Sequence, residues 1–262
     1  MRIAKLDGLN VHYTDEGDPN GAPIVFANSL GTDLRLWDDL VPLLPAGLRI
    51  IRYDKRGHGL TDTTPGPYSM GTLVRDAEML LDHLGVKDAL FVGLSIGGMI
   101  AQGLAVKRLD LVRALVISNS AAKIGTADMW AERVRATRED GIESMADAVL
   151  QRWFGKAFRE TDAFAGWRNM LINQSVEGYA GCCSAISGTD FYTPTSGLRL
   201  PLLGIAGSED GSTPPDLVRE TIDLVPGSRF ELIRGAGHLP CAEKPEEYAR
   251  ILNTFIKETG HV

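Results

Sequence analysis

A serine flanked by glycines is the residue of this chain best suited to covalent chemistry. Ser95 stands at the centre of a G-x-S-x-G pentapeptide over residues 93–97. The apolar run 89–92 precedes it, and a helix-like segment, 96–107, follows it. Between a strand and a helix, this motif holds a serine on a sharp, strained turn with its hydroxyl exposed. Glycines are needed because backbone approaches backbone there and leaves no room for a Cβ atom. We therefore predict that Ser95 is a nucleophile rather than part of an ordinary glycine-rich turn.

A serine hydroxyl becomes a good nucleophile only when a base takes its proton, and histidine is the base that triads use. His238 is the best candidate because it follows a strand-like run, 230–233, and lies downstream of Ser95. This position fits triads with the chain order serine, acid, histidine. The other histidines lie in less suitable places: His12 in an alternating strand-like run, His58 in a turn before the serine where we expect it to shape the loop, His83 in a helical segment, and His261 next to the end of the chain.

The acid of such a triad is expected between the serine and the histidine, after another strand. The apolar run 202–207 predicts that strand, and Glu209 and Asp210 follow it. We favour Asp210 because it completes a G-x-x-D-x-x-T-P-P arrangement that starts at Gly207, and Glu209 is its rival. The carboxylate holds the imidazole in the required tautomer and stabilises the imidazolium that forms during attack.

A tetrahedral intermediate also needs two backbone N–H donors directed at its oxyanion. One is expected from Ile96, the residue after the nucleophile. The other is expected from the loop that follows the apolar run 24–27, where residues 28–31 read Asn-Ser-Leu-Gly. Leu30 is the candidate donor in this loop.

Four stretches together resemble the α/β-hydrolase superfamily across the whole chain: residues 28–31, D-x-R-G-H-G at 54–59, G-L-S-I-G-G-M at 93–99, and Gly-His at 237–238. Three stretches of the middle segment, 118–130, 151–154 and 177–183, are similar to the 3-oxoadipate enol-lactonases in particular. The chain departs from its relatives at two places. Asn-Ser at 28–29 replaces the usual His-Gly, and Leu-Pro at 239–240 replaces a small polar residue after the histidine.

The resemblance implies hydrolysis of 3-oxoadipate enol-lactone to 3-oxoadipate, a step of aromatic-compound catabolism in the β-ketoadipate pathway. The implied machinery is a triad of Ser95, His238 and Asp210 with a backbone oxyanion hole and no cofactor. A carboxylesterase, a perhydrolase and a carbon–carbon bond hydrolase are alternatives on the same scaffold. A ligand-binding receptor is less favoured, because it has no need of nucleophile, base, acid and oxyanion loop together.

The implied substrate is a small anionic lactone, whereas the chain carries a net charge of −7. A local cation or a set of N–H donors must therefore face the pocket. We choose Arg133, which lies three residues after Trp130 and so shares a helical face with it. Trp153 is expected to complete an apolar wall. The alternative is that both tryptophans belong to the core of the middle segment and that Arg133 faces solvent. The other cations of this segment are Lys123, Arg135, Arg138, Arg152, Lys156, Arg159 and Arg168.

Charge and composition argue against several classes of function. The net charge of −7 is unfavourable for binding nucleic acid or an anionic membrane. No apolar run approaches the roughly 20 residues that span a bilayer, and the N-terminus leads into strand-like sequence without a signal peptide. No histidine cluster or paired-cysteine pattern indicates a metal site. The three cysteines fit buried apolar side chains in a reducing cytoplasm.

Strand and helix patterns alternate in a way that predicts how these residues are positioned. The resemblance implies an α/β-hydrolase fold, with a mostly parallel central sheet, helices on both faces and a helical lid. We expect the core to comprise residues 1–120 and 196–262 and the lid residues 121–195, where strand patterns vanish and apolar residues recur at helical spacing. Strands are expected at 3–6, 10–15, 24–27, 49–53, 89–93, 115–118, 202–206 and 229–233, and helices at 37–44, 70–84, 96–107, 215–224 and 246–259.

Overall fold

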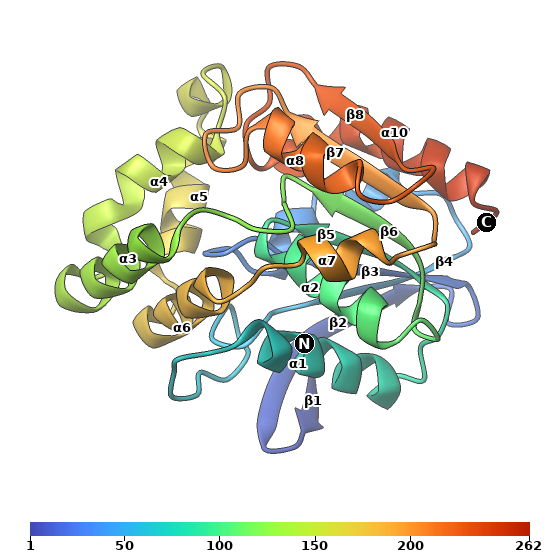
Figure 1. The fold of residues 1–262 in the computed structure, drawn as a ribbon, viewed down its shortest axis with the longest axis horizontal. Coiled ribbons are helices and arrows are strands. Elements are labelled where there is room, and N and C mark those ends of the chain that lie inside the picture. The colour runs from blue at the N-terminus through green and yellow to red at the C-terminus, as the bar shows by residue number, and fades with distance from the viewer.

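The computed structural model describes residues 1–262, and its centre is an eight-stranded sheet (Figure 1). The strand order is β1-β2-β4-β3-β5-β6-β7-β8. The first two strands form a hairpin, β2 is antiparallel to β4, and the remaining pairs are parallel. The strands are β1 (Arg2–Leu6), β2 (Leu9–Gly17), β3 (Ala22–Ala27), β4 (Leu48–Tyr53), β5 (Ala89–Leu94), β6 (Val112–Ser118), β7 (Leu202–Gly207) and β8 (Arg229–Ile233). The expected mostly parallel sheet is confirmed.

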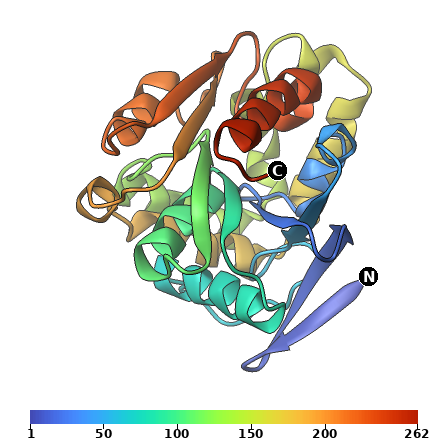
Figure 2. The same ribbon diagram turned by 90° about the vertical axis from the view of Figure 1, so that its right-hand side faces the viewer.

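The central strands are apolar along their whole length because both faces of the sheet are covered. Every residue of β5 and β7 is buried. Helices α1 (Met70–His83), α2 (Ile96–Lys107) and α8 (Pro215–Ile222) cover one face, and α10 (Pro245–Glu258) covers the other together with the short elements η1, η2 and α9 (Figure 2). In α10, buried side chains recur at positions 248, 251, 252, 255 and 256, the spacing of one helical face.

One expected helix is wrong. Residues 37–44 do not form an α-helix; this part of the chain contains two separate 3-10 turns, η1 (Leu34–Trp37) and η2 (Val41–Leu43). Pro42 stands inside the second turn, and a proline lacks the N–H that an α-helix needs there. The first turn begins earlier than expected because Asp33 caps it, accepting a hydrogen bond from the N–H of Arg35.

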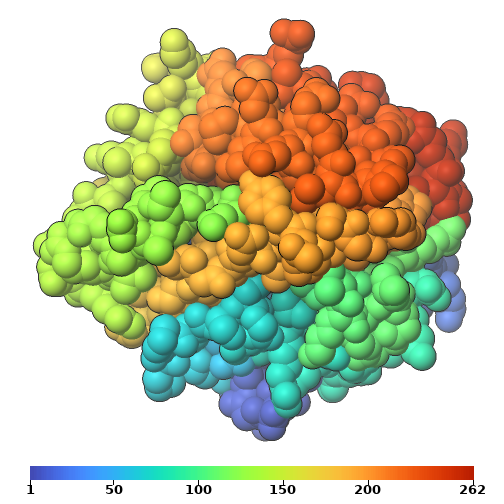
Figure 3. Space-filling model, viewed as in Figure 1, coloured from blue at the N-terminus to red at the C-terminus, as the bar shows by residue number.

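The chain between β6 and β7 carries five α-helices, the last of which packs against α2. These are α3 (Ala127–Asp140), α4 (Ala146–Trp153), α5 (Ala163–Ile172), α6 (Val176–Ser187) and α7 (Tyr192–Ser196), with short 3-10 turns η3 (Glu143–Met145) and η4 (Phe158–Glu160). Helix α3 packs along α6, and α4 along α5. In the space-filling view these segments, yellow-green to gold, lie directly against the core (Figure 3). The division at residues 121 and 195 into lid and core stays a prediction.

The register of the parallel strands brings the candidate site residues to one edge of the sheet. Ala27 pairs with Gly93, so the loop after β3 leaves the sheet beside the turn that holds Ser95. Leu94 pairs with Ser118, and Gly207 at the end of β7 pairs with Ile233 at the end of β8. Ligands of open α/β sheets bind at the carboxyl ends of the strands for this reason. None of the helices is long and apolar enough to cross a membrane.

Candidate active site

Ser95 sits on a strained turn between β5 and α2. Its backbone has φ 57° and ψ −120°, a conformation that residues other than glycine rarely adopt. A Cβ on Gly93 would lie 2.2 Å from the carbonyl oxygen of Gly97, and a Cβ on Gly97 would lie 2.1 Å from that of Ala27. Two bonds hold the serine backbone: its N–H donates to the Ser118 carbonyl at 3.0 Å, and the hydroxyl of Ser120 donates to its carbonyl at 2.6 Å. The glycines are thus required by the close backbone approach, as the sequence predicted.

His238 and Asp210 form a buried pair. Nδ1 of His238 lies 2.8 Å from Oδ2 of Asp210, and both side chains are almost inaccessible to solvent. The backbone N–H of His238 donates to the Trp153 carbonyl at 2.6 Å, which fixes the histidine loop against α4. With its proton on Nδ1 and directed to the carboxylate, the imidazole presents Nε2 as a proton acceptor. Nε2 has no hydrogen-bond partner in the protein, and neither has the hydroxyl of Ser95.

The carboxylate of Asp210 is well satisfied by hydrogen bonds. Oδ1 accepts from the N–H groups of Ser212 (2.7 Å) and Thr213 (3.0 Å), and Oδ2 accepts from Nδ2 of Asn119 and the Thr213 hydroxyl, each at 2.8 Å. Burial acts to raise the pKa of Asp210, but the charge of His238 and the hydrogen bonds outweigh it, so the pKa lies below its ordinary value. The acid is therefore ionised when its neighbour takes a proton.

Glu209 points elsewhere, although it is adjacent in sequence. Its Oε2 accepts from the N–H of Lys156 at 2.9 Å. Of the two acids that the sequence left open, Asp210 is the one that contacts the histidine.

The two expected oxyanion donors are free. The N–H groups of Leu30 and Ile96 donate to no acceptor in the protein, while the neighbouring Gly31 N–H donates to Nε2 of His58 at 3.0 Å. Burial, together with the charge of Lys55, holds the pKa of His58 well below its ordinary value, so His58 is neutral and accepts this bond. His58 thus shapes the loop as expected and leaves Leu30 as the free donor.

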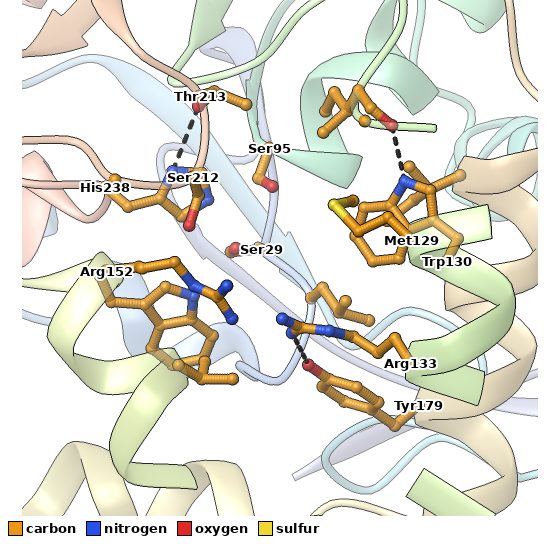
Figure 4. Close-up of a pocket in the computed structure, with 17 residues that line it drawn as sticks. Ser29, Ser95, Met129, Trp130, Arg133, Arg152, Tyr179, Ser212, Thr213 and His238 are labelled. Carbon is orange, nitrogen blue, oxygen red and sulfur yellow. Dashed lines mark hydrogen bonds between the residues drawn. The ribbon is translucent and has the colours of Figure 1, made fainter. Parts of the chain in front are cut away.

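Ser95, His238 and Leu30 line one pocket, which encloses about 690 Å³ with the open solvent at its mouth included (Figure 4). Trp130 and Trp153 also line it, from α3 and α4. Both tryptophans are buried, and Nε1 of Trp130 donates to the Ile124 carbonyl at 2.6 Å. The two readings of these tryptophans are therefore compatible, because each side chain packs in the middle segment and also forms part of the pocket wall.

Arg133 lines the same pocket and does not simply face solvent. Its guanidinium lies 5.8 Å from the ring centroid of Trp130, and Nη1 donates to the hydroxyl of Tyr179 at 3.0 Å. Trp130 and Arg133 share a face of α3, as their spacing predicted. Arg133 forms no salt bridge with any carboxylate of the chain, and neither does Arg152.

Arg152 is a pocket residue that the sequence reasoning missed. Its guanidinium and that of Arg133 point toward one another across the pocket (Figure 4). Burial and then the charge of Arg133 lower the pKa of Arg152. A signal was available, because Arg152 immediately precedes Trp153 in one of the stretches that resemble the enol-lactonases. Tyr179, in another of these stretches, was also missed.

Comparison with known proteins identifies the family of this chain. A model of the alpha/beta hydrolase family matches residues 24–251. The chain belongs to the α/β-hydrolase family. It is 32% identical to 3-oxoadipate enol-lactonase 2 of Acinetobacter baylyi over 94% of this chain and 93% of that one, and 31% identical to 3-oxoadipate enol-lactonase 1 of the same organism over 98% and 97%. The crystal structure of the enol-lactonase from Burkholderia xenovorans LB400 superposes with a TM-score of 0.94 at 33% identity, over 98% of this chain and 100% of that one. The protein is an enol-lactonase-like α/β hydrolase.

The structure of this α/β hydrolase contains no group of three or more histidine, cysteine, aspartate or glutamate side chains arranged to hold a metal ion. Its three cysteines are free and buried, as expected for small apolar side chains. Burial raises the pKa of each thiol, to about 12 for Cys182 and further for the other two, so none is a thiolate at neutral pH.

Glu243 joins the histidine loop of the hydrolase to the middle segment. Its Oε1 accepts from the N–H of Gly237 at 2.7 Å, and its Oε2 accepts from the N–H of Gly155 at 2.8 Å. Burial raises the pKa of Glu243 to about 7, against the effect of these two bonds, and the nearby charges of Glu209 and Asp210 add to the rise. No sequence pattern marked this residue, because its two partners lie in separate loops.

The raised pKa of Glu243 predicts that stability falls as pH rises. An unfolded carboxyl ionises near pH 4.5, whereas Glu243 in the folded protein keeps its proton up to about pH 7. Between these values the folded state binds more protons, so the free energy of unfolding decreases with pH. Glu243→Gln does not titrate, and we expect the wild type to lose roughly 2 kcal/mol relative to this variant between pH 5 and 8. Urea unfolding at each pH measures the difference. Glu246→Gln, at an exposed position of α10, is the control; a difference that is independent of pH contradicts the prediction.

Proposed function

We propose that this hydrolase opens 3-oxoadipate enol-lactone to 3-oxoadipate. The observation that carries the proposal is a pair of arginines, Arg133 and Arg152, that face the pocket of Ser95 and His238 without a carboxylate partner. Two unpaired cations near a nucleophile suit an anionic ester, and the relatives named 3-oxoadipate enol-lactonase make the enol-lactone the first candidate. The net charge of −7 gives no general attraction for an anion, so selectivity must arise in the pocket.

In the proposed reaction Oγ of Ser95 attacks the carbonyl carbon of the lactone ring, and its proton passes to Nε2 of His238. Asp210 stabilises the imidazolium through the Nδ1 hydrogen bond without taking the proton. The carbonyl oxygen becomes an oxyanion, which the N–H groups of Leu30 and Ile96 bind. These donors are already free and fixed, so they need no rearrangement as the charge develops.

The ring C–O bond then breaks, and the leaving enol oxygen takes the proton from His238. An enolate is less basic than an alkoxide, so this bond breaks readily. The enol remains tethered to the acyl group, and ring closure competes until it tautomerises to a ketone. Water activated by His238 next attacks the acyl-enzyme, and the same two N–H donors bind the second oxyanion. The product 3-oxoadipate leaves and Ser95 regains its proton.

Arg133 is proposed to bind the carboxylate of the side chain, with Trp130 and Trp153 beside the ring. A guanidinium offers two parallel N–H donors to a carboxylate, and partial burial beside tryptophan strengthens the attraction. Arg152 faces the same point and adds a second positive charge. The three free, buried cysteines are consistent with a reducing cytoplasm as the place of action.

A substrate panel tests the proposal directly. We expect turnover of 3-oxoadipate enol-lactone, followed by loss of the enol-lactone chromophore, to have a higher kcat/KM than that of neutral lactones and aryl esters of similar size. A carboxylesterase, perhydrolase or carbon–carbon bond hydrolase would instead prefer its own substrate class in the same panel. A kcat/KM for the enol-lactone no higher than for neutral esters refutes the proposed substrate.

Loss of Arg133 is expected to act on the anion selectively. Arg133→Ala removes a charge-assisted hydrogen bond worth about 1.5–3 kcal/mol, which corresponds to roughly a 10- to 100-fold loss of kcat/KM, mainly through KM. Hydrolysis of a neutral ester of similar size should change little. Arg135→Ala is the matched control, because Arg135 lies on the same helix but pairs with Glu132 and Glu139 at the surface. Equal losses on both substrates, or no loss on either, rule out this role for Arg133.

A further inference from the structure

A buried lysine lies behind the oxyanion loop and has no role in the reaction described so far. Lys55 occupies the variable position of the D-x-R-G-H-G motif and is 2% exposed. Its Nζ donates to the carbonyl of Ser29 at 2.5 Å and to that of Thr32 at 3.1 Å. Lys55 forms no salt bridge, so its ammonium is held in the interior by two carbonyl oxygens of one loop.

The Ser29 carbonyl accepts three hydrogen bonds. Besides the bond from Lys55, it accepts from the N–H of Thr32 at 3.3 Å and from the Thr32 hydroxyl at 3.0 Å. Hydrogen bonds to a carbonyl oxygen polarise the peptide group and strengthen its own N–H as a donor. A cation among the three donors increases this effect, because hydrogen bonds to charged groups are the strong ones.

The N–H of this same peptide group belongs to Leu30. In a planar trans peptide the C=O and the N–H point in opposite directions. Ser29 and Leu30 line the catalytic pocket, whereas Lys55 does not, so the lysine lies on the far side of the loop. With its oxygen held from that side, the peptide directs the Leu30 N–H toward the pocket, where it has no protein acceptor.

We propose that Lys55 is a positioning residue that orients and polarises the Ser29–Leu30 peptide, and that its buried charge stabilises the oxyanion through this peptide. The inference rests on the Ser95-centred hydrolysis proposed above, but not on the identity of the lactone. Lys55 touches neither the substrate nor Ser95. Its effect is therefore expected in the steps that form an oxyanion and not in ground-state binding.

No carboxylate forms a salt bridge with Lys55, because the neighbouring acids are bonded to other groups. Asp54 accepts from the N–H groups of Leu34 and Leu60 and pairs with His12, while Asp33 pairs with Arg35. The other titratable neighbours are His58 and, on α6, Cys182. Burial lowers the pKa of Lys55 to about 8, and the charges of Asp54 and Asp33 only partly oppose this. The ammonium is present below about pH 8 and is lost above it.

The test uses Lys55→Met, which keeps the volume of the side chain and removes its charge and donors, and Lys55→Gln, which keeps a neutral donor. The substrate is a neutral aryl acetate, and active sites are counted by stoichiometric phosphonylation of Ser95, so that any misfolded fraction does not enter kcat. Loss of a direct oxyanion donor costs about 10²–10³ in kcat. For Lys55→Met we expect a smaller loss of roughly 10- to 100-fold, because Thr32 still holds the carbonyl. KM should stay within about twofold, since the ground state is unaffected. Lys55→Gln should be intermediate.

Arg56→Met is the control, because Arg56 is the next residue of the motif and its buried pair with Asp76 does not involve the oxyanion loop. It should lower the melting temperature without lowering kcat per active site. The wild-type kcat should also decline above about pH 8, and this decline should be absent from Lys55→Met. If Lys55→Met does not fold, the pH profiles of wild type and Lys55→Gln provide the same comparison.

An unchanged kcat per active site in both Lys55 variants, or a loss expressed in KM alone, overturns the proposal. An alkaline decline that persists in both variants overturns the contribution of the charge. The expected Lys55 effects on the aryl ester, together with no turnover of the enol-lactone, support this inference and refute the proposed substrate.

Discussion

Replacing Ser95 with alanine is expected to lower kcat by roughly 10⁴- to 10⁶-fold while the protein remains folded. The substitution removes the only atom that attacks the carbonyl, and it leaves His238 Nε2 with no nucleophile to activate. The hydroxyl forms no hydrogen bond in the free protein, so its loss leaves no buried partner unsatisfied. Alanine keeps the Cβ that the turn already accommodates and adds no further atom, so the turn should not change. Turnover per mole of enzyme and the melting temperature are the two measurements.

Ser196→Ala provides the matched control, since Ser196 is an exposed serine of α7 whose hydroxyl bonds only to the Thr193 carbonyl. Its kcat should equal that of the wild type. Adding His238→Ala to Ser95→Ala should reduce kcat little further, because nucleophile and base act as a unit. If Ser95→Ala keeps more than a tenth of wild-type turnover, Ser95 is not the nucleophile. The same variant separates an enzyme from a ligand-binding receptor, which would keep its ligand affinity and have no turnover to lose.

Asp210→Asn is expected to lower kcat by about 10³- to 10⁴-fold, the second largest effect. An amide in place of the carboxylate directs an N–H at Nδ1 and favours the wrong imidazole tautomer, in which Nε2 carries the proton. It also removes the negative charge that stabilises the imidazolium. The backbone N–H groups of Ser212 and Thr213 continue to hold the oxygen of residue 210 that faces away from the histidine, so the fold should persist. Circular dichroism checks the fold, and steady-state kinetics measure the loss.

Glu209→Gln is the control for this variant, because the two acids are adjacent and only one contacts the histidine. Its Oε2 accepts from the Lys156 N–H, a bond that the glutamine carbonyl can also accept. We expect a change in kcat of less than about threefold, which lies within the range of one weak hydrogen bond. A crippled Glu209→Gln beside a nearly active Asp210→Asn would show that the acid had been assigned to the wrong residue.

The positions of the candidate catalytic residues were predictable because each of them has a local signature. Backbone sterics around Ser95 demand glycines at 93 and 97, and these appear directly in the sequence. Parallel strands buried on both faces appear as apolar runs, and the chain order of the loops that follow them places Asp210 and His238 at one edge of the sheet. The free N–H of Ile96, the proposed oxyanion donor, follows from the same turn. Such patterns extend over a few residues and depend little on the rest of the molecule.

The helix expected at 37–44 was wrong because periodicity alone did not take single backbone constraints into account. Apolar spacing there is compatible with a helix, but Pro42 and the Asp33 cap favour two 3-10 turns, of which η1 packs against α9 and η2 against α10. Propensity is a weak prior that packing and single backbone constraints override.

Only the tertiary structure decided which cations face the pocket and what lies behind it. Arg133 and Arg152 come from different helices, and the spacing of the chain does not show that Arg152 faces the pocket while Arg135 points to solvent. Glu243 reaches Gly155 across 88 positions of the chain, and Lys55 reaches the Ser29 carbonyl across 26. These contacts arise when separate loops pack together and buried polar groups must find partners. The sequence alone thus determined where the reacting groups lie along the chain, because steric and periodic constraints are local. The polar contacts that fix the loops of the site, and the cations that face its pocket, were decided by packing, because they join residues with no shared sequence pattern.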